Sequence, residues 1–127
     1  MVEEDGQPSK RDEEGPVPRR WRATLESIVH ALVEHDFRFQ APLPNVLSPT
    51  PAQTKQMREY VADYGERLCP LTEETWDTSV CLWDEDRWSL LVDLRTEGEG
   101  RSDLALSLVV YEDTGGYRFE LELLYVP

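Results

Sequence analysis

Lysine, histidine and cysteine are scarce in this chain of 127 residues, which has two cysteines, two histidines and only two lysines among its 13 basic residues. Cys69 and Cys81 stand in neither a C-x-x-C pair nor a Cys/His spacing typical of zinc, so we expect two reduced structural thiols. His30 and His35 are separated on a predicted helix by roughly 140° and cannot share a metal ion. The sequence therefore predicts no metal site.

Long apolar runs are also lacking. The stretch 104–111 is among the longest and contains Ser107, whereas a membrane-spanning helix needs about 20 apolar residues. The opening residues, MVEEDGQPSKRDEEGP, are acidic and do not follow the basic-then-apolar order of a secretory signal. We expect a cytoplasmic protein that does not enter a membrane.

Motifs of known catalytic chemistry are absent from the sequence. It has no G-x-S-x-G elbow, phosphate-binding glycine loop, dinucleotide fingerprint or H-E-x-x-H. Glu34, His35 and Asp36 are adjacent, but neighbours on a helix point apart and do not form a triad. We assign no catalytic residue and no cofactor, and an enzyme is the less favoured interpretation.

Acidic residues are abundant, with 26 Asp and Glu against 13 Lys and Arg and a net charge of −13. The excess is concentrated in residues 71–127, where 14 acidic residues face four arginines. Nucleic acids and anionic lipids are poor partners for such a surface, because phosphate contacts need clustered Lys and Arg. A basic protein is the partner that this charge favours.

The first half of the chain predicts an acidic tail followed by two helices. Residues 1–17 have almost nothing to bury, and we expect them to be disordered, with a single domain over 18–127. A helix to about residue 36 is indicated by apolar residues at helical spacing: Trp21, Leu25, Ile28, Val29, Leu32 and Val33. A second helix begins after Thr50, which forms a capping box with Gln53, and ends at Gly65.

From residue 75 the apolar period changes to two, which predicts strands at 76–83, 88–95, 103–111 and 117–126. If Leu82 faces Trp88, the intervening Asp84, Glu85 and Asp86 form a three-residue loop. The alternative, a calcium-binding acidic loop, lacks the alternating oxygens and the glycine of an EF-hand. We interpret CLWDEDRW as a turn.

The later connections extend the same pattern. TEGEGRS would place Leu94 opposite Leu104 and Arg95 opposite Asp103, and EDTGG would close a last hairpin. Its inward row is Leu104, Leu106, Leu108 and Val110 against Tyr117, Phe119, Leu121 and Leu123. The expected fold is α+β, with two N-terminal helices packed on one face of a four-stranded antiparallel meander, α-α-β-β-β-β.

The other face of this sheet is the candidate functional surface. The predicted register aligns Asp77, Asp93, Ala105 and Glu122 in one row, beside a row with Ser79, Leu91, Ser107 and Glu120. Aspartates on adjacent strands repel unless a cation or a basic partner lies between them. We predict a partner-binding surface with Trp83 at its edge: Asp77, Asp93, Glu120, Glu122 and Trp83.

Other interpretations of the same residues stay open. The carboxylates could form an ordinary solvated sheet face, and one bulge would disrupt the rows; a divalent-metal site is less favoured because no histidine stands near. A second hypothesis is a small-molecule binder or enzyme with a pocket lined by Tyr60, Tyr64 and the inward tryptophans. A third is a structural subunit whose strand edge, ELELLYVP or TWDTSVCL, pairs with a second copy.

Four stretches carry a resemblance to a known family: YVADYGE, TWDTSVCLW, VDLRTEGEGRSDL and GGYRFELELLYVP. Over residues 21–127 the chain resembles an uncharacterised family of small bacterial domains of unknown function. The resemblance implies a single cytosolic domain and brings no functional residue with it. In size and charge alone, the chain is also similar to immunity proteins that neutralise basic nuclease toxins.

Overall fold

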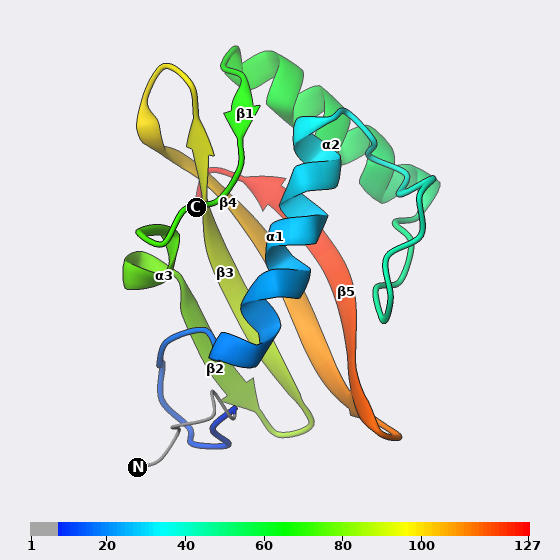
Figure 1. Ribbon diagram of the computed structural model, residues 1–127, viewed down its shortest axis with the longest axis vertical. Helices are drawn as coiled ribbons and strands as arrows, with labels where there is room; N and C mark the ends of the chain where they lie inside the picture. Colours follow the sequence, from blue (N-terminus) through cyan, green and yellow to red (C-terminus); the bar gives the residue numbers. More distant parts are fainter. Residues whose placement is uncertain (1–7) are drawn as a thin grey trace.

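The computed structural model describes residues 8–127, which form an antiparallel sheet with three helices (Figure 1). The α+β class and the antiparallel sheet are confirmed. In chain order, the elements are α1 (Arg19–Val33), α2 (Pro51–Tyr64), β1 (Leu68–Cys69), α3 (Thr75–Thr78), β2 (Val80–Asp84), β3 (Arg87–Thr96), β4 (Gly100–Asp113) and β5 (Gly116–Tyr125). The described part of the chain thus has one strand and one helical turn more than the sequence predicted.

Capping contacts and backbone angles explain the ends of the two longer helices. The side chain of Thr50 accepts from the amide of Gln53 at 3.1 Å, the side chain of Gln53 accepts from the amide of Thr50 at 3.0 Å, and Gly65 ends α2 at a φ of 84°. Helix α1 ends at Val33, before the expected residue 36, because His35 turns into the left-handed region at a φ of 65°.

The sheet has the strand order β1-β3-β4-β5, and β2 also pairs with β3. Strands β1 and β2 share one edge of β3: β1 pairs at Arg95 and Thr96, and β2 pairs with residues 87–91. The expected strand at 76–83 is wrong in its first half, because residues 75–78 form α3. The chain crosses from β1 to β2 through this single helical turn.

The β2–β3 hairpin corrects the predicted register by one residue. Trp83 pairs with Trp88 and Asp84 with Arg87, so the loop holds Glu85 and Asp86 only, with Glu85 at a φ of 61°. A two-residue loop with positive φ matches the twist of the flanking strands, whereas the expected three-residue loop would not give this pairing. Because a slip of one residue reverses every side chain, Cys81 and Trp83 lie on the face expected for Leu82.

Bulges change the remaining registers. Asp93 pairs with Ala105 as expected, but the register then shifts and Arg95 lies opposite Arg101 instead of Asp103. Between β4 and β5, Leu108 pairs with Leu121 and Ser107 with Leu123, so an extra residue enters β5 at Glu122. Leu124 is fully buried and Leu123 is 45% exposed, so the expected inward place of Leu123 is wrong.

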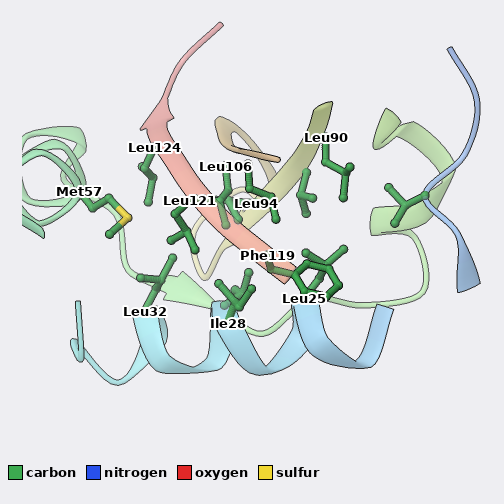
Figure 2. Packing of buried hydrophobic residues seen from close by; sticks show 14 of the residues in the cluster. Leu25, Ile28, Leu32, Met57, Leu90, Leu94, Leu106, Phe119, Leu121 and Leu124 are labelled. Atoms are coloured by element: carbon green, nitrogen blue, oxygen red, sulfur yellow. The ribbon is translucent and has the colours of Figure 1, made fainter. Parts of the chain in front are cut away.

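The core lies between α1 and the sheet face that we call the inner face. Leu25, Ile28 and Leu32 point from α1 toward the sheet (Figure 2). Trp21 of α1 meets Trp88 of β3 edge to face, with ring centroids 5.2 Å apart, and both rings are buried. Helix α2 contacts β5, and its Met57 belongs to the same buried cluster as Leu124 of that strand (Figure 2).

The segment before α1 packs against the sheet. Gly15 pairs with Cys81 through two backbone hydrogen bonds of 2.8 and 2.9 Å, and Val17 is fully buried. The indole of Trp88 donates to the carbonyl of Ser9 at 2.8 Å. The tail expected at 1–17 therefore belongs to the fold over at least residues 15–17, and its first seven residues lie outside the described part.

Candidate functional site

The outer face of the sheet, turned away from α1, has an apolar middle. One cross-strand row is Leu82, Ser89, Val109 and Glu120, and the next is Val80, Leu91, Ser107 and Leu123. Leu123 is 45% exposed, and Val80, Leu82 and Leu91 are half-buried. Val109 is buried, with 4% exposure. We call Val80, Leu82, Leu91 and Leu123 the outer apolar strip.

Three of the predicted carboxylates border this strip. Glu120 lies opposite Val109, and Asp93 lies opposite Ala105. Glu122, the extra residue of the β5 bulge, accepts a hydrogen bond of 2.7 Å from the hydroxyl of Ser107. The sheet thus brings Asp93, Glu120 and Glu122 to one face, although not in the expected rows, because Ala105 pairs with Tyr125 instead of Glu122.

Asp77 reaches the same neighbourhood from α3 and not from a strand. It lines a hollow of about 230 Å³ together with Thr78, Asp93, Arg95 and Arg101. The hydroxyl of Thr78 donates to the carboxylate of Asp93, and the guanidinium of Arg95 lies 3.6 Å from Glu74. Carboxylates and guanidinium groups line the same hollow, so this end of the outer face carries charges of both signs.

Glu120 is paired within the sheet. Its carboxylate accepts from Nε of Arg118 at 2.8 Å, and this hydrogen bond raises the pKa of the Arg118 guanidinium above its ordinary value. Arg118 also lies over the ring of Tyr111, 4.9 Å from its centroid. Within residues 8–127, Glu120 alone of the three bordering carboxylates forms an ion pair, so Asp93 and Glu122 are the acids that a partner's cation could pair with.

Trp83 does not lie at the edge of the predicted partner-binding surface. The corrected register turns it to the inner face, where its ring is 4.6 Å from that of Trp88 and is covered by the ammonium of Lys10 at 5.1 Å. The sequence analysis did not identify Leu82 and Leu123 as surface residues. Simple alternation of side chains, without the β5 bulge and the two-residue β2–β3 turn, assigns both of them to the inner face.

The side chains considered for a small-molecule pocket have partners within the chain. The hydroxyl of Tyr60 accepts from the amide of Val126 at 3.2 Å, and that of Tyr64 donates to Glu99 at 2.8 Å. Burial, followed by the hydrogen bond with Glu99, raises the pKa of Tyr64 above its ordinary value. The inward tryptophans Trp21 and Trp88 pack against one another, so these residues serve the core.

The β5 edge expected to pair with a second copy is occupied by this chain. Phe119 exchanges backbone hydrogen bonds of 2.8 and 2.9 Å with Asn45 and Leu47. Farther along, the side chain of Gln53 donates to the carbonyl of Leu121, and Gln56 binds both backbone groups of Leu124. This edge is therefore not an open template for another strand.

Two kinds of site are absent from residues 8–127. Within that range, no group of three or more His, Cys, Asp or Glu is placed to hold a metal ion. No helix of the same range is long and apolar enough to cross a membrane.

Comparison with known proteins places the chain in a family. A family model described as a domain of unknown function, DUF7668, matches residues 29–127. No curated protein and no solved structure matches the chain.

Proposed function

The chain belongs to the DUF7668 family of domains of unknown function, and we propose that it is a non-enzymatic protein-binding domain of the cytoplasm whose outer sheet face contacts a basic partner. The observation that carries this proposal is the outer apolar strip with Asp93 and Glu122 at its border. Such a surface offers apolar contact at its centre and charge at its rim, which is the usual anatomy of a protein interface.

Charge and exposure support the choice of partner. Leu123 is exposed to 45% on a strand that otherwise buries its leucines, and exposed apolar residues rimmed by polar ones mark interaction surfaces. The net charge of −13 favours encounter with a cationic protein.

Charge reversal on the outer face tests the proposal. A partner captured from the native host would be purified and titrated calorimetrically against the full chain and a variant with Asp93→Lys and Glu122→Lys. We expect affinity to fall about tenfold or more, which corresponds to about 1.4 kcal/mol, and the salt dependence to weaken.

A matched control reverses the same number of charges elsewhere. Glu59→Lys and Asp63→Lys lie on the exposed side of α2, and we expect them to bind as the unaltered chain does. Leu123→Ser changes the strip without changing charge and should also weaken binding. A partner that binds the reversed variant and the unaltered chain equally well would refute this location of the interface.

A further inference from the structure

The hollow beside α3, at one end of the outer sheet face, gathers charges of both signs. It measures about 230 Å³ and lies where α3 borders β3 (Figure 1). Its charged lining is Glu74, Asp77, Asp93, Arg95 and Arg101. The guanidinium of Arg95 is 18% exposed and lies 3.6 Å from the carboxylate of Glu74. Once these two are paired, two carboxylates and one guanidinium of the lining remain.

The remaining groups share the hollow without pairing across it. Asp77 and Arg101 are exposed, and within residues 8–127 neither side chain forms an ion pair or a hydrogen bond. Asp93 accepts a hydrogen bond from the hydroxyl of Thr78 and forms no ion pair in the same range. Opposite charges that line one hollow without contact leave the space between them for a ligand that carries both signs.

A bulge in the sheet sets the position of Arg101. Asp93 pairs with Ala105 and Arg95 pairs with Arg101, so residues 102–104 of β4 stand against the single residue 94 of β3. Ser102 of this bulge is buried, and its hydroxyl donates to a carbonyl of β3 at 2.8 Å. Bulges re-aim side chains, and like charges directly opposite on neighbouring strands destabilise a sheet. An anionic group between the two guanidinium groups would offset this repulsion.

A buried hydroxyl adds a neutral donor to the same lining. Thr75 lines the hollow and is 3% exposed. Its hydroxyl accepts from the amide of Thr72 at 3.1 Å and, among the described residues, donates to no acceptor. Because a hydroxyl can donate as well as accept, a ligand carboxylate in the hollow would provide an acceptor for it.

Size and charge together define the ligand. A volume of about 230 Å³ is below the roughly 300 to 1,000 Å³ of pockets for drug-sized ligands, so the ligand is small. A phosphate ester would meet three carboxylates and is a poor fit. Because two carboxylates and one guanidinium are left after Glu74 pairs with Arg95, the complementary ligand has one anionic and two cationic groups. A basic α-amino acid has this set of charges.

We propose that this hollow binds a free basic α-amino acid, with its carboxylate on Arg101 and its two cationic groups on Asp77 and Asp93. A guanidinium can hold a carboxylate through two parallel hydrogen bonds. Asp93 keeps acceptor positions besides the one that Thr78 uses, because a carboxylate has about four. The proposal does not depend on a protein partner and is tested on the chain alone, so either proposal can fail without the other.

Calorimetric titration of the full chain at low salt with L-arginine and L-lysine tests the site. We expect saturable one-to-one binding of both. Agmatine, which lacks the carboxylate, and L-citrulline, which lacks the side-chain cation, should each bind about tenfold or more weakly than L-arginine. The proposal would be overturned if neither L-arginine nor L-lysine bound, or if agmatine bound as tightly as L-arginine.

Variants locate the site. Arg101→Gln should weaken L-arginine about tenfold and leave agmatine unchanged, because it removes only the group that meets the carboxylate, whereas Asp77→Asn should weaken both. Arg20→Gln on α1 and Asp63→Asn on α2 remove the same charges from other exposed positions and should leave binding unchanged. If the control variants lost as much affinity as the hollow variants, net charge and not the hollow would hold the ligand, and the proposal would be wrong. Circular dichroism verifies that each variant is folded.

Discussion

Tyr64 shows how one side chain at the end of α2 secures the connection between β3 and β4. Its hydroxyl donates to the carboxylate of Glu99 at 2.8 Å and accepts from the amide of Asp103 at 3.3 Å. Glu99 in turn accepts from the hydroxyl of Thr96 at 3.0 Å. Burial, followed by the hydrogen bond with Glu99, favours the protonated phenol over the phenolate and raises the pKa of Tyr64.

The raised pKa of Tyr64 predicts a stability change in alkali. Above the ordinary value of 10.0, the unfolded chain releases the proton while the folded chain keeps it, so the free energy of unfolding falls as pH rises toward the folded-state pKa. Tyr64→Phe should be less stable than the unaltered chain by about 1 kcal/mol at neutral pH, because it loses these hydrogen bonds.

The difference between the two proteins should then narrow above pH 10. Denaturant unfolding at pH 8 and at pH 11 measures it, and the other four tyrosines are common to both chains. Well below pH 10, Tyr64 keeps its proton in both the folded and the unfolded chain, so its contribution to the free energy of unfolding should not vary with pH. If the stability difference between Tyr64→Phe and the unaltered chain were the same at both pH values, the pKa of Tyr64 would not be raised by folding.

At the scale of elements, the edge of β5 is closed by side chains that imitate a neighbouring strand. The amide of Gln56 donates to the carbonyl of Leu124 at 2.7 Å and accepts from its backbone N–H at 3.1 Å. These are the two groups that a further strand would pair with. Helix α2 thus contributes edge protection as well as the buried Met57 and Val61.

Gln56→Ala should weaken this edge. Two backbone groups of Leu124 lose their partners, which costs roughly 1 to 3 kcal/mol where they are shielded from water. Denaturant unfolding and hydrogen exchange at the Leu124 amide measure the effect, which should appear in both.

Lys55→Ala is the matched control on the same helix. Lys55 is exposed, and among the described residues its ion-pair partner is Glu59 at 3.6 Å, a contact worth about 0.3 to 0.5 kcal/mol. Equal destabilisation by the two variants, or an unchanged exchange rate at Leu124, would be inconsistent with edge protection by Gln56.

At the scale of the whole molecule, the core extends beyond the part that the family model matches. The match begins at residue 29, within α1. Val17, Trp21, Leu25 and Ile28 precede it and have exposures of 0 or 1%. Residues 19–28, two thirds of the helix that covers the inner face, are therefore outside the matched region.

A fragment of residues 29–127 should not fold cooperatively. Loss of one buried Leu or Trp side chain costs roughly 2 to 5 kcal/mol, and a whole domain has only about 5 to 15 kcal/mol of stability. Near-ultraviolet circular dichroism during heating measures the transition, and a fragment of residues 15–127, which keeps all four residues, should retain it. Cooperative unfolding of the shorter fragment at the temperature of the longer one would show that α1 is not essential.

The sequence alone determined those features that depend on neighbours along the chain. The apolar spacing of Trp21, Leu25 and Ile28 gives α1, and Thr50 with Gln53 gives the start of α2, because a helix is closed by contacts three or four residues apart. Period-two alternation gave the antiparallel sheet and the pairing of Asp93 with Ala105. In each case the energetic preference is local or follows from one buried face.

The tertiary structure decided which face each residue of β2 and β5 occupies. The two-residue turn at Glu85 places Trp83 on the inner face, and the extra residue at Glu122 places Leu123 on the outer face. Side chains alternate along a strand, so a shift of one residue moves each following side chain to the opposite face. The hollow beside α3 depends on residues 74–78, 93–95 and 101, which are separated in the sequence. Only packing brings such segments together, so composition and period could not predict either surface.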